Sequence, residues 1–268
     1  MQTALTIAGS DSSAGAGVQA DLKTFAAFGL YGVTAITAIT AQSTRGVEAV
    51  APLAADLVTA QIEAVAGDFT IAATKIGMLA TAAIVEAVAA AIEELELPLV
   101  VVDPVLVSTS GDRLLDDDGM DAVRKLLLPL ARVVTPNVAE AEALSGVRIT
   151  SADTLCEAAR RLHKLGARGV VITGGHASGA TVEDVVFDGN RFHEHRVARV
   201  DSGHTHGTGC TFASAVAAGL ALGHELPEAA ARAQEYVAGA IAHAPGLGHG
   251  RGPLDHFWEL RAPGTRSG

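Results

Sequence analysis

Short apolar segments alternate with longer helical patterns through most of this chain, and the alternation limits the folds that the chain can adopt. Segments 4–8 (ALTIA) and 99–103 (LVVVD) have the length and the branched side chains of buried strands. Between such segments, apolar residues recur every three or four positions, as in 17–28. Strands that alternate with helices predict a mostly parallel sheet covered by helices on both faces.

The same patterns give expected boundaries for the elements. The predicted strands are 4–8, 33–40, 73–77, 99–103, 132–135 and 169–173, and the predicted helices are 17–28, 56–66, 81–95, 151–165, 209–222 and 227–243. Residues 182–200 predict an antiparallel hairpin at one edge, because Gly189-Asn190 separates two strand-like runs. Thr150 and Asp153 predict a capping box before the 151–165 helix. We expect one domain over 1–260 and a disordered tail over 261–268.

Composition excludes several classes of function. The net charge is −11 and Lys and Arg form no cluster, which argues against binding to nucleic acid or to anionic membranes. Cys156 and Cys210 are too few for a disulfide framework. No apolar run approaches the ~18 residues of a membrane span, and the first residues lack the basic region of a signal peptide. We therefore expect a soluble, cytoplasmic protein whose ligand is a small molecule.

A glycine-rich turn at residues 203–209 precedes a run of small apolar residues, FASAVAAGLALG. Glycine permits a tight turn, and the helix that follows would leave its first N–H groups unpaired beside the positive end of its dipole. Such a terminus is suited to phosphate. The same field would favour the thiolate form of Cys210 at its edge. The alternative is a glycine-rich loop with a small core cysteine.

The first predicted strand is followed by a dinucleotide-like pattern. Residues 15–20 (GAGVQA) match GxGxxA, which in NAD-binding folds requires an acidic residue about 20 positions later. The chain reads Thr40-Ala41-Gln42-Ser43 there, without an acid. An NAD-linked oxidoreductase is therefore disfavoured.

Three further candidates follow predicted strands, where ligands bind in sheets of this kind. Gln42 offers both a donor and an acceptor, as a ring with an exocyclic amine requires, and a solvated loop glutamine is the alternative. Met78 is either a pocket wall or core filler. Asp103 ends the most hydrophobic strand, in a position that suits a metal ion, a phosphate group or a helix cap.

Asn137 and Glu140 lie three residues apart after another strand. The spacing predicts a helix-capping pair, and it equally predicts a water-mediated Mg²⁺ site, since hard cations prefer carboxylate and amide oxygens. The two interpretations do not exclude each other. The remaining polar candidates are histidines, which we expect to be solvated because no third metal ligand accompanies the pairs His193/His195 and His204/His206.

Taken together, the motifs resemble those of the hydroxymethylpyrimidine/phosphomethylpyrimidine kinases, thiamine-biosynthesis enzymes of the ribokinase-like group. The matching segments cover roughly residues 3–258 in order: AGSDSSAGAGVQADLKTF, ITAQSTRGV, TKIGML, VVDPV, TPNVAEAE, GGH, THGTGCTF and GHGRGP. GTGCT is specific, because most ribokinase-like sugar kinases look like GAGD there. Cys210 thus occupies the position of their catalytic aspartate.

The resemblance implies a ribokinase-like three-layer α/β/α fold, with a mostly parallel central sheet and an antiparallel edge hairpin, often as a homodimer. It also implies that ATP and Mg²⁺ serve two successive phosphorylations, of the pyrimidine alcohol to its monophosphate and then to its diphosphate. Pyridoxal kinase is the alternative within the group, and a non-catalytic pyrimidine-binding protein is a more distant one.

The resemblance assigns roles to individual residues. Cys210 would be the catalytic base, and Gly207, Thr208 and Gly209 would form the anion hole. The remaining roles are substrate binding by Gly9, Asp21, Gln42, Met78 and Val105, nucleotide binding by Asn137, Glu140, Thr173 and Gly175, and metal binding by Asp103 and Glu140.

Three positions depart from the family pattern. Ala14 stands where Gly is common, Thr173 replaces a common Lys before GGH, and His204 stands where Asn often precedes THGTG.

Overall fold

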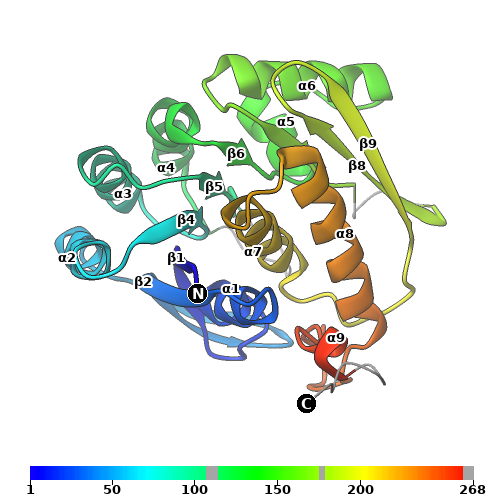
Figure 1. Cartoon of the computed structure of the whole chain (residues 1–268), viewed down its shortest axis with the longest axis horizontal. Coiled ribbons are helices and arrows are strands. Elements are labelled where there is room, and N and C mark those ends of the chain that lie inside the picture. The colour runs from blue at the N-terminus through cyan, green and yellow to red at the C-terminus, as the bar shows by residue number, and fades with distance from the viewer. Residues whose placement is uncertain (107–113, 175–178, 262–268) are drawn as a thin grey trace.

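The computed structural model describes residues 1–106, 114–174 and 179–261, which form a twisted sheet between helices (Figure 1). Across the sheet the strands are β3 (Gly46–Pro52), β2 (Tyr31–Ser43), β1 (Thr3–Asp11), β4 (Ile71–Ile76), β5 (Val100–Val102), β6 (Val133–Val134), β7 (Val170–Ile172), β8 (Thr181–Phe187) and β9 (Phe192–Ala198). The six central strands, β2, β1, β4, β5, β6 and β7, are parallel to one another. The hairpin β8–β9 is antiparallel, as predicted.

Two apolar cores, one on each face of the sheet, account for the three layers. Successive residues of β5 alternate between them: Val100 and Val102 join one core, and Val101 joins the other. The first face carries α2 (Ala55–Ala66), α3 (Ala82–Glu94), α4 (Asp117–Ala122), α5 (Val138–Ser145) and α6 (Ala152–Lys164). The second carries α1 (Gly17–Ala27), α7 (Thr208–Ala221) and α8 (Leu226–Ala242). The predicted three-layer α/β/α fold is confirmed.

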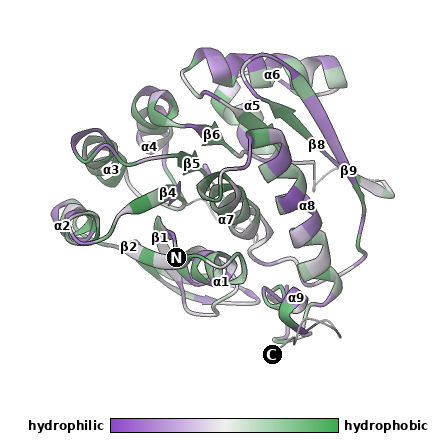
Figure 2. Ribbon diagram, viewed as in Figure 1, coloured by the Kyte–Doolittle hydropathy of each residue, from purple (hydrophilic) through white to green (hydrophobic). Residues whose placement is uncertain are grey.

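Helix α7 lies at the centre of the second face, between the sheet and α8 (Figure 1). Every residue from Thr211 to Ala221 is buried, which explains why the run consists of small residues. A Cβ atom built on Gly219 would lie 2.9 Å from the Cβ of Ala229 in α8, so a larger residue would push the two helices apart. The edge strand β9 differs from the buried helix α7, because it is coloured hydrophilic over most of its length in Figure 2.

Several predicted details were wrong or incomplete. The strand β3, antiparallel to β2 at the opposite edge, was not predicted, because its exposed residues lack an apolar alternation. Nor was α4, which continues through a π-helical turn at Val123–Leu127. The capping box of α6 is formed by Ser151 and Thr154 rather than by Thr150 and Asp153, since the helix begins one residue later than that pairing requires.

At the C-terminus, Arg261 ends the short helix α9 (Trp258–Arg261) instead of starting a tail, and residues 262–268 lie outside the described residues. Among the helices described, none has both the length and the apolar character needed to cross a membrane.

Candidate active site

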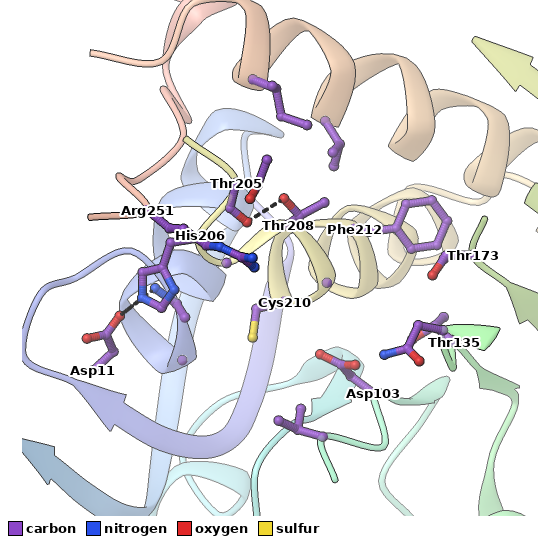
Figure 3. A pocket seen from close by; sticks show the side chains of 18 of the residues that line it. Asp11, Asp103, Thr135, Thr173, Thr205, His206, Thr208, Cys210, Phe212 and Arg251 are labelled. Carbon is purple, nitrogen blue, oxygen red and sulfur yellow. Dashed lines mark hydrogen bonds and ion pairs between the residues drawn. The ribbon is translucent and has the colours of Figure 1, made fainter. Parts of the chain in front are cut away.

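A cavity of about 900 Å³ opens at the carboxyl ends of the parallel strands, where such sheets bind ligands. Its walls come from segments that are far apart in the sequence: the ends of β1, β2 and β5, the loops after β4 and β6, the strand β9, and the first turn of α7. Figure 3 shows Asp11, Asp103 and Thr173 around the thiol of Cys210. The strand order therefore gathers the polar residues that the sequence placed after separate strands.

The first turn of α7 borders this cavity with its N–H groups. Gly207 caps the helix in the left-handed region, at φ 84°, and no side chain accepts a hydrogen bond from the turn. The hydroxyl of Thr208 donates instead to the carbonyl of Thr205, at 2.8 Å. Gly207, Thr208 and Gly209 all line the cavity. The predicted glycine turn at a helix N-terminus is confirmed, and N–H groups that no side chain caps border the cavity, an arrangement that suits an anion.

Cys210 projects from this turn on the side of Asp103 (Figure 3). Its thiol is half-buried, and burial together with the carboxylates of Asp103 and Asp21 raises its pKa to about 12. The ammonium of Lys75 and a hydrogen bond from the N–H of Gly17 oppose that rise without overcoming it. The prediction of a thiolate at this helix terminus was therefore wrong for the free protein, because burial and nearby carboxylates favour the neutral thiol.

Asp21, predicted to contact the substrate ring, is fully buried outside the cavity lining. Its carboxylate accepts hydrogen bonds from Lys75 Nζ at 3.0 Å, Thr6 Oγ1 at 2.6 Å and Ser214 Oγ at 2.7 Å. Lys75 is also fully buried, and its Nζ lies 3.8 Å from Oδ2 of Asp103. Asp21 thus links α1, β1, β4 and α7 beneath the site, and it is separated from any ligand in the cavity.

Gly9, Gln42, Met78 and Val105, the other residues predicted to bind the substrate, all line the cavity. Met78 packs against Gly9: a Cβ at Gly9 would lie 3.2 Å from the Met78 sulfur. This glycine near the end of β1 therefore leaves room for the thioether, which forms part of the wall.

His206 was predicted to be solvated, and this was wrong. The side chain is 7% exposed, and its Nε2 lies 2.7 Å from Oδ2 of Asp11 in the wall of the cavity. The same Nε2 lies 3.2 Å from the amide nitrogen of Gln42. Asp11 and His206 are 195 residues apart in the chain, so no local pattern could have paired them.

Asn137 and Glu140 form the predicted capping box at the start of α5. Asn137 Oδ1 accepts from the Glu140 N–H, and Glu140 Oε2 accepts from the Asn137 N–H, both at 3.0 Å. Burial, and next the carboxylate of Asp103, raise the pKa of Glu140 to about 8. Burial likewise raises the pKa of Asp103 to about 6. Both carboxylates line the cavity, so the cap leaves the proposed metal-binding role open.

Of the two remaining nucleotide-side candidates, Thr173 lines the cavity and Gly175 lies outside the described residues. Phe212, Val237 and Ile241 contribute apolar surface. Two arginines that received no role from the sequence, Arg199 and Arg251, also line the cavity. Arg251 belongs to the GHGRGP motif, whereas only its position in the folded chain reveals Arg199. Among the described residues, no cluster of three or more His, Cys, Asp or Glu side chains could hold a metal ion alone.

Comparison with known proteins identifies the family. The family model described as phosphomethylpyrimidine kinase matches residues 11–255. The chain belongs to the phosphomethylpyrimidine kinase family. The match covers the cavity walls from Asp11 through Arg251, and the predicted family is confirmed.

Two bacterial proteins illustrate how similar the chain is to its relatives. A hydroxymethylpyrimidine/phosphomethylpyrimidine kinase of Streptomyces coelicolor is 48% identical over 256 residues, which cover 96% of this chain and 94% of that protein. A thiamine biosynthesis bifunctional protein of Geobacter sulfurreducens is 47% identical over 253 residues; the match covers 94% of this chain and 52% of that longer protein.

Among solved structures, an ADP complex of Bacillus subtilis pyridoxal kinase superposes with a TM-score of 0.89 at 40% identity, covering 97% of this chain and 99% of that chain. The fold is therefore ribokinase-like, and the enzymes that share it at this level are phosphotransferases. Phosphomethylpyrimidine kinases and pyridoxal kinases share this scaffold, so fold alone does not determine which ring is bound.

Proposed function

We propose that this enzyme transfers a phosphoryl group from ATP to 4-amino-5-hydroxymethyl-2-methylpyrimidine, and a second one to the resulting monophosphate. The observation that carries the proposal is that one cavity joins the amide of Gln42 to the uncapped N-terminus of α7. An amide can pair with the amino group and the ring nitrogen of a pyrimidine, and helix N–H groups can hold the transferring phosphoryl group. The activities named for the relatives support the same reaction.

ATP would occupy the part of the cavity lined by side chains of α7 and α8. Phe212, Val237 and Ile241 offer apolar surface to an adenine ring, and Thr173 and Asn137 pair in a β-bridge after β7 and β6. This orientation brings the triphosphate to the first turn of α7, opposite the ring pocket. Asn137, Glu140 and Thr173 are therefore proposed as nucleotide-side residues.

The donor set also fits Mg²⁺. Asp103 Oδ2 is buried without a hydrogen-bond partner, and Glu140 is the neighbouring carboxylate. Hard cations prefer such oxygens, so Asp103 and Glu140 would hold the ion. When bound, Mg²⁺ would offset the charge that develops on the transferring phosphoryl group.

Cys210 is proposed as the group that takes the hydroxymethyl proton in the first transfer. Phosphoryl transfer depends mainly on positioning and charge stabilisation, and its loose transition state delays proton loss until the alcohol oxygen has begun to bond to phosphorus. The alcohol is by then more acidic, so the small fraction of Cys210 that is thiolate at neutral pH can take its proton. Gly207, Thr208 and Gly209 would hold the phosphoryl oxygens meanwhile.

The second transfer makes a different demand. Its acceptor is already a phosphate, so there is no hydroxyl proton to remove, but two anions must approach each other. Arg199 and Arg251 line the cavity and would reduce that repulsion. The second transfer should therefore depend on anion binding more than on Cys210.

The experiment that tests the proposal is ³¹P NMR of the products from ATP, Mg²⁺ and the hydroxymethylpyrimidine. Appearance of a monophosphate ester followed by a diphosphate supports both transfers. Pyridoxal phosphorylation is the second candidate, favoured by the 40% identity to the B. subtilis pyridoxal kinase. A competition assay with both alcohols decides between them, and absence of any phosphoryl product would indicate a non-catalytic pyrimidine-binding protein.

We further propose a cytoplasmic homodimer. Ile39 on β2 and Val50 on the edge strand β3 are 45% and 39% exposed, and an exposed apolar edge favours association. Light scattering of the purified chain, over a range of concentrations, would measure the mass.

A further inference from the structure

We propose that His206, fixed by Asp11, is a positioning residue that sets the orientation of the Gln42 amide and so the order of donor and acceptor offered to the substrate ring. The inference relies on the proposed function for the identity of the ring. Its structural part depends only on the hydrogen bonds around Asp11, His206, Gln42 and Thr40.

The hydrogen between Asp11 and His206 is carried by the histidine. The Asp11 carboxylate accepts from the N–H groups of Ser13, Gly15 and Ala16, at 2.8, 3.1 and 2.8 Å. Burial would raise the pKa of Asp11, but the hydrogen bonds from His206 and Ser13 outweigh it and lower the pKa. Asp11 is therefore an ionised acceptor, and His206 Nε2, at 2.7 Å, must carry the hydrogen.

The contact between His206 and Gln42 then brings two donors together. An Nε2 that bears a hydrogen has no lone pair left to accept another. The Gln42 amide nitrogen, 3.2 Å away, is also a donor only. Two donors facing each other form no hydrogen bond, so this side of the amide requires the oxygen.

On the opposite side of the same amide, Thr40 favours the same orientation independently of the histidine. The Thr40 hydroxyl donates its one hydrogen to the carbonyl of Ser10, at 2.9 Å. The Gln42 oxygen lies 3.2 Å from this hydroxyl, so it competes for that one hydrogen with the nearer carbonyl of Ser10. A half-turn of the amide exchanges nitrogen and oxygen and improves both contacts: the amide nitrogen can donate to the Thr40 oxygen, and the amide oxygen can share the Nε2 hydrogen of His206 with Asp11.

The preferred orientation therefore has the Gln42 oxygen towards His206 and the amide nitrogen towards Thr40. Because His206 directly precedes the capping glycine of α7, the ring-reading amide is tied to the turn proposed to hold phosphate. A fixed amide offers its acceptor and donor in one order, whereas a freely rotating amide could read a ring in either sense. His206 is thus a determinant of ring choice that need not touch the reacting atoms.

The orientation can be measured without substrate. In ¹⁵N-labelled protein, the Gln42 side-chain amide signal is identified by its loss in Gln42→Leu. The inference expects nuclear Overhauser contacts from the amide protons to the Thr40 methyl group, and a His206 ring protonated at Nε2. Amide protons close to the His206 ring, or an unprotonated Nε2, would overturn it. This result is independent of whether the proposed substrate is correct.

Kinetics test the consequence. We expect His206→Gln and Thr40→Val each to raise KM for the hydroxymethylpyrimidine by about 2- to 12-fold, the range for one hydrogen bond, with the KM for ATP unchanged. Thr34→Val, on the same strand outside the cavity lining, is the matched control and should have no effect.

A double-mutant cycle separates positioning from a general structural effect. In the Gln42→Leu background, His206→Gln should have no further effect on ring KM, because the amide that it orients is gone. Additive losses, or a parallel rise in the KM for ATP, would overturn the positioning role. Thr40→Ser, which keeps the hydroxyl, should restore the wild-type ring KM.

Discussion

The pH dependence of the first transfer is the sharpest test of the role of Cys210. A thiol with a pKa of about 12 is protonated almost completely at neutral pH, and its thiolate fraction rises about tenfold with each pH unit. A base acts only in its deprotonated form, so kcat/KM for the alcohol should rise with pH. Because the pKa lies far above the accessible range, no plateau should be reached between about pH 6.5 and 8.5, and the expected gain is about 100-fold.

The assay is the initial rate of monophosphate formation at saturating ATP and Mg²⁺, followed by quenching and chromatography. Cys210→Ala should lower the rate by ~10²-fold or more near neutral pH and should remove the pH dependence. The second transfer is an internal control, since its acceptor has no hydroxyl proton to lose. It should vary little with pH in the same range and should be less affected by the substitution.

Two results would refute this reasoning. A wild-type first transfer that is flat with pH, combined with a large loss in Cys210→Ala, would mean that the thiol serves packing or positioning. A parallel pH rise in both transfers would assign the titration to groups shared by both steps, such as Asp103 and Glu140, whose pKa values are raised to about 6 and about 8.

Three further predictions follow from the contacts described. Glu140→Gln should raise the Mg²⁺ concentration needed for half-maximal activity, because glutamine keeps the capping box but loses the charge; a change in thermal stability alone would leave only the cap. Gln42→Leu should lower kcat/KM for the hydroxymethylpyrimidine about 5- to 150-fold, or roughly 1–3 kcal/mol, and pyridoxal less; an equal loss for both alcohols would make Gln42 a loop-shaping residue. Lys75→Met should leave the buried Asp21 carboxylate without its cation and cost about 3–5 kcal/mol, which is a fall in Tm of about 5–9 °C for a chain of this length. Lys125→Met, at an exposed ion pair, is its control, and an equal fall in both would contradict the reasoning.

The parts of the fold that could be predicted from the sequence are those that leave a local pattern. The strands of the parallel sheet are buried on both faces, so they appear as continuous apolar runs, and the Asn137/Glu140 cap is formed within one helical turn. The strand β3 went unrecognised because its side chains are mostly exposed and its pairing with β2 leaves no apolar period. The π-helical turn at Val123–Leu127 departs from the spacing of an α-helix, so the apolar residues of this segment do not recur with the α-helical period.

The site could be predicted as a set of residues but not as a network. The residues that follow separate strands converge because those strands are neighbours in the sheet. The order of the strands in the sheet cannot be read from local patterns. The pairing of Asp11 with His206 and the burial of Asp21 are long-range contacts, which spacing cannot reveal. The Cys210 pKa was predicted in the wrong direction because the helix dipole is visible in the sequence, whereas the depth of the thiol and its carboxylate neighbours are not.

The hydrogen bond from Ser214 to Asp21 has a consequence for how the protein is made. Ser214 follows Asp21 by 193 residues, so the ribosome produces Asp21, Lys75 and the central strands long before α7 exists to cover them. Until then the second apolar face of the sheet and a charged pair intended for the interior remain open to solvent, a state that is prone to aggregation. Closure by the last quarter of the chain makes folding depend on contacts of large sequence separation, which are slow to form. Nascent chains that stop before Thr208 should therefore require chaperone protection, whereas chains that extend past Ala221 can complete the core and the phosphate-binding turn in the same event.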